Sequence, residues 1–463
     1  MRVLFATAEL APLARVGGLA EAAAGLVAQL RADGVQLELV LPDYDRTELA
    51  DETTSTLTVP GWASPAMVRR GVHPVVGAVT LVAVPGIQRP HPYVDTNGNG
   101  WPDNDLRFFA FSAAVAAIAD ATKPDVVHLN DWHTAATLAF LTKARPSMLT
   151  IHTLGYQGIC DPWWLGKLPN HAESYAWFDV CNPLVGGIRL ADSIVAVSPT
   201  YAREIVASAE GQGHEHELAA RGDALVGILN GIDVAQWNPA TDPHIAARYH
   251  VGSVARGKKA CRKALLDRVG LADVDGEPVI GVVSRLVDQK GIDLFVECMP
   301  FIERLGARVV VLGSGDRWLA DALRGAAATW PERVAFVDGY DGPLAHQIFA
   351  GSDLFVMPSR FEPCGLAQMQ AMAYGTLPIV ADVGGLHDTV IDADDHPAIG
   401  MGIVLSSVSA AALTDALHRG VALWRDRSRR ATARTNCMTP DWSWKVPAAQ
   451  HIDLYRRLIA GDV

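Results

Sequence analysis

Short apolar runs rich in β-branched residues alternate along this chain with longer helical patterns. In the first half the runs are Val3–Ala6, Leu37–Leu41, Thr80–Val84, Val126–Leu129, Met148–His152 and Ile194–Val197. In the second half they are Val279–Ser284, Val309–Gly313, Val334–Val337, Leu354–Met357 and Pro378–Ala381. Continuous apolar strands between helices are typical of parallel sheets that are covered on both faces. Two such series in succession predict an α/β chain with two doubly wound domains.

The boundary between the two domains is predicted between Asn238 and Gly276. That segment begins with the turn-rich sequence Asn-Pro-Ala-Thr-Asp-Pro and continues into a basic helical pattern. We place the first domain at residues 1–245 and the second at residues 246–444. A chain of 463 residues is long enough for two large α/β domains.

Composition and charge narrow the function classes. Apolar residues make up 49% of the chain and charged residues 19%, so a large core can form. This excludes a wholly disordered chain, a collagen and a small disulfide scaffold. The net charge of −12 argues against general binding to nucleic acid or to an anionic membrane. The basic run 256–268 fits one solvated helix face.

The cysteines and the N-terminus indicate the compartment. None of the six cysteines lies two residues from another, so no zinc or redox pair of the usual spacing is present. Scattered thiols in a long chain are typical of a reduced, cytoplasmic protein. The N-terminal residues predict a strand and not a signal peptide, and Ala110–Ala121 is too short to span a bilayer. We expect no metal centre.

Polar residues follow several strands of the first half, at the ends where open α/β sheets bind ligands. Gly17 and Gly18 open an Ala-rich helix, which suits an approaching anion, although a plain turn is equally compatible. Asn130-Asp131 follows the fourth run and indicates either a site or a helix cap. His152 and Thr153 follow the fifth.

The second half carries charged residues at comparable positions. Arg285 and Lys290 lie five residues apart just past a strand, where two cations can hold a diphosphate from two sides; the alternative is a solvated loop. Glu362 opens a helical run with a carboxylate suited to sugar hydroxyls. Gly384-Gly385 begins another short helical run.

Taken in order, these motifs resemble the bacterial starch/glycogen synthase family of retaining glycosyltransferases. Further segments similar to that family are 100–104, 107–108, 197–205, 228–233, 237–239, 345–366 and 441–444. The resemblance implies a GT-B fold, in which two Rossmann-like domains face each other across a cleft and a final helix, about 445–463, crosses back to the first domain. It also implies transfer of a sugar from a nucleotide diphosphate to a hydroxyl with retention of the α configuration, without a metal or an organic cofactor.

The resemblance implies roles for individual residues. The catalytic set is Asp131, His152, Arg285, Lys290 and Glu362, in which the two cations offset charge on the leaving diphosphate. The donor-binding set is Arg15, Gly17, Gly18, Tyr340, Cys364, Gly365, Leu366, Asp382, Gly384 and Gly385, with Tyr340 packing on the nucleotide base. The acceptor-side set is Tyr93, Asn130, Thr153 and Val185.

The chain departs from the family pattern at several of these positions. Arg15 replaces the usual Lys, Thr153 the usual Asn, and Val185 a usual Lys. Asp382 stands where the family tends to be basic. Gln370 and the segment 214–218 also differ from the family. These differences lead us to expect weaker elongation of glycogen from ADP-glucose than by a standard glycogen synthase.

Three functions are compatible with the motifs. The first is a synthase of α-glucan type. The second is a pseudoglycosyltransferase that joins a nucleotide-activated cyclitol to an amino sugar through a C–N bond, as in acarbose-type pathways. The third is a non-catalytic nucleotide-sugar-binding protein, against which the complete catalytic set argues. The sequence leaves open the nucleotide base, the acceptor (a sugar, a glucan or an amino sugar) and the oligomeric state.

Overall fold

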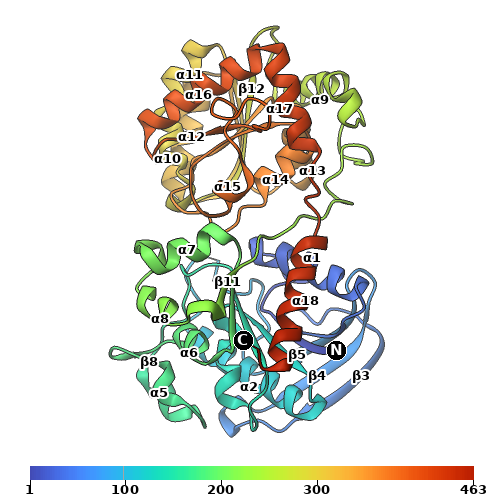
Figure 1. The fold of residues 1–463 in the computed structure, drawn as a ribbon, viewed down its shortest axis with the longest axis vertical. Coiled ribbons are helices and arrows are strands. Elements are labelled where there is room, and N and C mark those ends of the chain that lie inside the picture. Colours follow the sequence, from blue (N-terminus) through green and yellow to red (C-terminus); the bar gives the residue numbers. More distant parts are fainter. Residues whose placement is uncertain (97, 463) are drawn as a thin grey trace. The chain divides into compact units, whose positions relative to one another are not determined.

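The computed structural model describes residues 1–96 and 98–462 (Figure 1). The chain forms two compact units. Unit 1 comprises Met1–Gly231 with Trp444–Val463, and unit 2 comprises Ile232–Ser443. The boundary expected at 245/246 lies inside unit 2. Within the described residues, no helix is both long enough and apolar enough to cross a membrane.

Unit 1 is built on one mixed sheet with the strand order β11-β10-β7-β6-β1-β2-β5-β4-β3. Its strands are β1 (Arg2–Ala6), β2 (Gln36–Pro42), β3 (Ala50–Leu57), β4 (Ala66–His73), β5 (Gly77–Ala83), β6 (Val126–Asn130), β7 (Ser147–Ile151), β10 (Ser193–Ala196) and β11 (Leu225–Gly227). The strands from β11 to β5 run parallel, whereas β3 and β4 add an antiparallel edge. The six predicted strands of the first half all form. Three further strands of this sheet, β3, β4 and β11, escaped prediction, and β3 is polar and mostly exposed.

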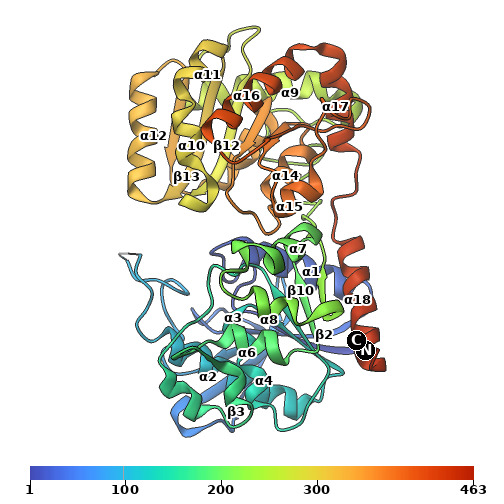
Figure 2. The ribbon, with the colours of Figure 1, turned by 60° about the vertical axis from the view of Figure 1, so that its left-hand side comes forward.

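Helices such as α1 (Gly18–Ala32), α2 (Asn104–Thr122) and α18 (Lys445–Ala460) cover this sheet (Figure 2). The other helices of unit 1 are α3 (Trp132–Ala135), α4 (Thr137–Phe140), α5 (Ala172–Tyr175), α6 (Pro183–Leu190), α7 (Pro199–Ala207) and α8 (Glu215–Ala219). A small hairpin of β8 (Ala176–Trp177) and β9 (Val180–Cys181) follows α5. The chain returns to unit 1 at Trp444, the N-cap residue of α18, as predicted.

The returning helix α18 is held by packing and by one buried polar link. Trp444, Ile452 and Leu458 join the apolar core formed by β1 and α1, and Figures 1 and 2 show α18 beside the N-terminal elements. The Tyr455 hydroxyl lies 2.6 Å from His128 Nδ1, on β6. The C-terminal helix is therefore an integral part of unit 1.

Unit 2 contains a fully parallel sheet in the order β14-β13-β12-β15-β16-β17. Its strands are β12 (Val279–Leu286), β13 (Arg308–Gly315), β14 (Val334–Asp338), β15 (Leu354–Met357), β16 (Leu377–Val380) and β17 (Ile403–Val404). Its helices are α9 (Val254–Val269), α10 (Ile292–Glu297), α11 (Met299–Leu305), α12 (Arg317–Thr329), α13 (Gly342–Gly351), α14 (Ala367–Ala373), α15 (Gly384–Thr389), α16 (Ala410–Arg425) and α17 (Arg427–Met438). All five predicted strands of the second half form.

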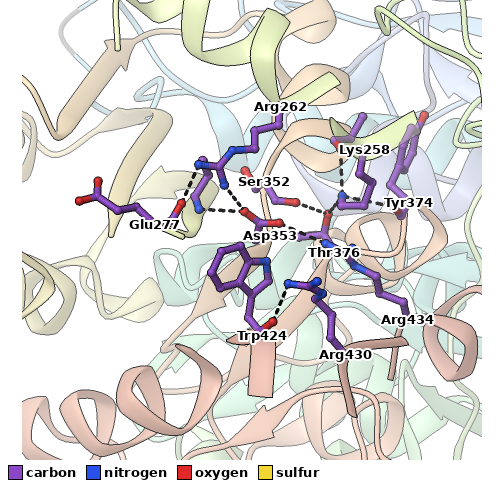
Figure 3. Close-up of polar contacts among 12 residues, drawn as sticks. Lys258, Arg262, Glu277, Ser352, Asp353, Tyr374, Thr376, Trp424, Arg430 and Arg434 are labelled. Atoms are coloured by element: carbon purple, nitrogen blue, oxygen red, sulfur yellow. Dashed lines mark hydrogen bonds and ion pairs between the residues drawn. The ribbon is translucent and has the colours of Figure 1, made fainter. Parts of the chain in front are cut away.

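A buried polar cluster fastens α9 and α17 to the sheet of unit 2 (Figure 3). Asp353 accepts from Arg262 at 2.6 Å, from Arg434 at 3.1 Å and from the backbone of Val279 at 3.1 Å. Lys258 donates to the carbonyls of residues 349, 350 and 374 and to the Thr376 hydroxyl at 2.6 Å. Burial lowers the pKa of Lys258 to about 7. Most polar atoms of these groups are satisfied by one another, Arg434 Nε excepted, which makes their burial tolerable.

Candidate active site

In unit 1 the predicted residues gather at one edge of the sheet. Strands β1, β6 and β7 are neighbours and run parallel, so their carboxyl ends coincide. Asp131 follows β6, and His152 follows β7. Glu9 lies a few residues beyond β1. Three chemistry-bearing side chains thus come from segments far apart in sequence.

Asp131 is held in an unusual conformation. Its φ of +53° with ψ of −173° is rare for a residue with a side chain and stores strain. The carboxylate accepts the backbone N–H of His152 at 2.7 Å. Burial raises its pKa to about 7, with the charge of Glu9 adding to the effect. At neutral pH this carboxyl group is therefore available in both protonation states.

His152 is neutral and has a defined tautomer. Its Nε2 lies 3.0 Å from Asn130 Oδ1, while the Asn130 amide donates to the carbonyl of Ala6. The Asn130 oxygen is an acceptor, so Nε2 carries the proton. Burial lowers the pKa of His152 to about 3. Nδ1 is then a lone-pair acceptor, a group that suits a sugar hydroxyl.

Glu9 organises the turn before α1, a role that the sequence analysis missed. Its carboxylate accepts the backbone N–H groups of Val16 and Gly17 at 2.8 and 2.9 Å. The other oxygen accepts the Tyr93 hydroxyl at 2.8 Å. The sequence signal for this role was the position of Glu9, a carboxylate shortly after the end of the first predicted strand. Because the Gly17 amide donates to Glu9, this carboxylate fixes the glycine turn.

The remaining predicted residues of unit 1 lie in different settings. Arg15 forms an ion pair with Glu21 at 2.8 Å. A Cβ at Gly17 or Gly18 would meet open space, so packing does not require these glycines. The Thr153 hydroxyl accepts the N–H of Gly155 at 3.1 Å. Val185 is fully buried in α6 and presents no surface to a ligand.

In unit 2 the central feature is the contact between Lys290 and Glu362. Lys290 Nζ lies 2.5 Å from Glu362 Oε2, and the Ser359 hydroxyl donates to the same oxygen at 3.1 Å. Glu362 is buried, since only 6% of its surface is exposed. Arg285, at the end of β12, is exposed and touches Gln289 at 3.4 Å. Lys290 is thus ion-paired with Glu362, whereas Arg285 is exposed.

The loop bearing these cations is fastened to the loop after β15. Gln289 donates to the carbonyl of Phe361 at 3.1 Å, and its own carbonyl accepts from the Arg360 backbone at 2.8 Å. Arg360 also grips Asp293 in α10 with both guanidinium arms, at 2.8 and 2.6 Å. These contacts fix Lys290 beside Glu362 before any ligand binds.

The Gly384-Gly385 turn packs on the same segment. A Cβ at Gly384 would overlap the Glu362 carbonyl oxygen, and one at Gly385 would overlap that of Cys364. The Gly385 N–H donates to the Glu362 carbonyl at 3.1 Å. Gln368, in α14, donates to the carbonyls of Cys364 and Gly365 and so shapes the loop up to Leu366. The glycines permit this close approach.

Two predicted donor residues lie apart from this cluster. The side chain of Tyr340, after β14, is 74% exposed, as a platform for a planar base would be. Asp382 Oδ1 lies 2.6 Å from His387 Nδ1, and both side chains are about half exposed. The sequence places this carboxylate where the family tends to be basic, and in the structure its partner is the imidazole of His387. Among the described residues, no group of three His, Cys, Asp or Glu side chains gathers as a metal site would require.

Comparison with known proteins decides the family. Residues 2–220 match the starch synthase catalytic domain, and residues 277–422 match glycosyl transferases group 1. A glycogen synthase of Halorhodospira halophila is 41% identical over 99% of both chains, and one of Acidiphilium cryptum is 40% identical over 99% of both. The chain belongs to the glycogen and starch synthase family. The predicted resemblance is confirmed, and this family member is a glycosyltransferase.

Solved structures agree with this assignment. The catalytic domain of starch synthase IV from Arabidopsis thaliana, bound to ADP and acarbose, is 31% identical, covers 99% of both chains and superposes with a TM-score of 0.89. Sucrose-phosphate synthase from Thermosynechococcus elongatus shares the fold at 19% identity, with a TM-score of 0.64. The predicted GT-B fold of two Rossmann-like units is confirmed for this synthase-family chain.

Proposed function

We propose that this protein is a retaining α-glucan synthase that transfers glucose from ADP-glucose to a hydroxyl of an α-glucan. Full-length similarity to proteins named glycogen synthase supports the acceptor class. The starch synthase with a TM-score of 0.89 carries ADP, which supports the nucleotide. None of these relatives favours a C–N bond-forming or a non-catalytic role.

The observation that carries the proposal is the prepared set of Arg285, Lys290 and Glu362. We assign the two cations to the diphosphate, where fixed positive charge offsets the negative charge that develops on the leaving group. Because these cations supply that charge, the reaction is proposed to need no metal. Glu362 is assigned to the hydroxyls of the donor sugar, and it also keeps Lys290 in position before the donor arrives.

Unit 1 is proposed to supply the groups that handle sugar hydroxyls. Neutral His152 offers Nδ1 as an acceptor, and Asp131, with a pKa of about 7, accepts or donates a hydrogen bond. In this scheme the departing phosphate oxygen takes the acceptor proton, so no protein nucleophile is required. We propose the cytoplasm as the site of action, in line with six free cysteines.

The test is turnover of the purified protein with glycogen and each of ADP-glucose and UDP-glucose. We expect nucleoside diphosphate release with ADP-glucose, undiminished by a metal chelator, and a product whose new anomeric proton has the α configuration by NMR. Release that requires an amino-sugar acceptor would replace the glucan proposal, and no turnover with any nucleotide sugar would indicate a binding protein. A β-linked product would remove the retaining assignment.

A further inference from the structure

Cys160 and Cys181 lie opposite each other in unit 1. They form an antiparallel bridge in which the N–H of each donates to the carbonyl oxygen of the other, at 2.9 and 3.1 Å. The Cys160 thiol also lies 3.6 Å from the Cys181 carbonyl oxygen. Both are free thiols; Cys160 is partly exposed, and Cys181 is buried. Two cysteines 21 positions apart in sequence are thus brought into register.

The backbone bridge brings the two cysteines within reach of a disulfide. In a hydrogen-bonded antiparallel pair the two Cα atoms are about 5.5 Å apart and the side chains share one face. Disulfides most often join Cα atoms about 5.5–6 Å apart. The Cβ atoms of such a pair are also about 5.5 Å apart, more than the roughly 3.5–4.5 Å found in disulfides. Joining the sulfur atoms therefore draws the two backbone segments together by about 1 Å.

The two cysteines lie at the ends of a segment, residues 160–181, that follows His152 along the chain. Gln157 Oε1 accepts from the Asn182 amide at 3.0 Å, and the Gln157 carbonyl accepts from Leu184 at 3.4 Å. Residues 157–160 therefore run beside residues 181–184. The segment between the cysteines contains α5 and the β8–β9 hairpin. A disulfide would fix both ends of the segment 160–181 next to the start of α6.

We propose that Cys160 and Cys181 are a reversible thiol–disulfide pair that staples the segment 160–181 when a small disulfide of the glutathione class is abundant. Cys160, the more accessible thiol, attacks one sulfur of the small disulfide as its thiolate and releases one small thiol. The Cys181 sulfur then attacks the sulfur of Cys160 and releases the second. Two protons leave the protein thiols, and two electrons reduce one small disulfide to two thiols.

The surroundings of Cys160 control the rate at which the disulfide forms. The hydrogen bond with the Cys181 thiol raises the pKa of Cys160 most, followed by burial and by the charges of Cys181, Asp105 and Asp161. Since the thiolate is the attacking species, formation of the link is slow at neutral pH and faster in alkaline solution. The pair therefore remains reduced through short exposures to oxidant.

The experiment exposes the full-length protein to excess oxidised glutathione at mildly alkaline pH, then alkylates free thiols and determines the mass. We expect the loss of two hydrogens, a peptide linking Cys160 to Cys181, and a melting temperature that rises by roughly 5 °C or more and falls again with reductant. Cys298 and Cys437, which lie buried in unit 2, should remain alkylatable after denaturation.

Variants separate this link from general oxidation. Cys160→Ser and Cys181→Ser should each abolish the crosslink and the rise in melting temperature, while the control Cys298→Ser should keep both. Since the decisive measurement uses the wild-type protein, a poorly folding variant does not hide the answer. A wild-type protein that keeps all six thiols, carries only a glutathione adduct, or crosslinks another pair would overturn the proposal.

Discussion

The candidate residues of the two units lie in different surroundings. In unit 1, Asp131 and His152 are held by hydrogen bonds to uncharged partners, a backbone amide and Asn130. In unit 2, Lys290 is paired with Glu362, and Arg285 stays exposed. Burial makes the protonation state of unit 1 adjustable, whereas the exposed or paired cations of unit 2 keep a fixed charge.

This difference extends to the polar groups of each core. Unit 1 fastens α18 with a Tyr–His contact between neutral groups, His128 and Tyr455. Unit 2 fastens α9 and α17 with Asp353 between two guanidinium groups. We therefore expect the stability and activity of unit 1 to depend on shape and protonation, and those of unit 2 to depend on charge. The following predictions test that division.

The largest effect is expected from Asp353→Asn. Removing this carboxylate charge leaves Arg434 buried without the anion that it contacts, although Arg262 keeps Asp273 at 2.8 Å. Breaking a buried ion pair destabilises a protein by about 3–5 kcal/mol. Tyr455→Phe, the counterpart in unit 1, should destabilise by only about 1–2 kcal/mol. Chemical denaturation, monitored by hydrogen exchange in each unit, measures the loss of stability in both variants. Equal losses would remove the proposed contrast between the two cores.

Loss of either donor cation should reduce kcat/KM by two or more decades. Arg285→Ala and Lys290→Ala each remove charge stabilisation of the leaving group, about 2–4 kcal/mol. Lys263→Ala and Arg317→Ala, at exposed positions of the same unit, serve as controls and should retain full activity. Steady-state kinetics with ADP-glucose decide the point. Near-normal turnover in Lys290→Ala would falsify the donor assignment.

Unit 1 should lose stability in acid before unit 2 does. Burial lowers the pKa values of His133 and His152 to about 3 and that of His451 to about 4. These histidines are neutral when folded but gain a proton when unfolded below pH of about 6.5. Their stabilisation is complete above that pH and decreases as the pH falls toward the folded values, by about 2 kcal/mol for each histidine at pH of about 5.

Melting curves at neutral and acidic pH, with hydrogen exchange resolved by unit, measure this acid sensitivity. His451→Gln removes one titrating group and should narrow the difference between the two conditions. If unit 2 opens first on acidification, buried histidines do not control the acid limit of this protein.

Asp131→Asn should change the pH dependence of turnover more than its maximum. The carboxyl group, with a pKa raised by burial to about 7, becomes ionised across the neutral range. We expect kcat/KM of the wild-type protein to rise with pH through about 7 and the asparagine variant to lose that step, with a decrease of about tenfold at high pH. An unchanged profile in Asp131→Asn would assign the step to another group.

The smallest effect is expected from Asp382→Asn. Because Asp382 and His387 are about half exposed, their pairing contributes little to folding. We expect an unchanged melting temperature and a change of about threefold or less in the ratio of kcat/KM for glycogen to that for a short glucan. His387→Gln removes the partner of Asp382 and serves as the matched variant, for which we expect the same result. A large loss of stability in either variant would contradict the exposed geometry.

Much of the fold followed from local patterns. The eleven apolar runs named from the sequence all became strands, because a strand covered on both faces must be apolar along its whole length. The exposed strand β3 has no such requirement, so its polar residues gave no signal. The return of the last helix was implied by the family resemblance and not by periodicity.

The roles of the site residues named from the sequence stay predictions. Asp131, His152, Arg285, Lys290 and Glu362 were named because each follows a strand and fits the family pattern. Gln289, Ser359 and Gln368 were missed, since they act on neighbours that are distant in sequence or on backbone carbonyls. Polar side chains of this kind are common in loops, and nothing in their spacing distinguishes a partner from a solvated group.

The sequence by itself determined the α/β class, the two domains, the family and the identity of the charged residues, because periodicity and motif order are local properties. Only the tertiary structure decided which groups meet. It buried Val185, gave Asp382 a histidine partner, joined Glu9 to the glycine turn and set Cys160 opposite Cys181. Such pairings depend on strand order and loop path, which bring together residues that no sequence spacing relates.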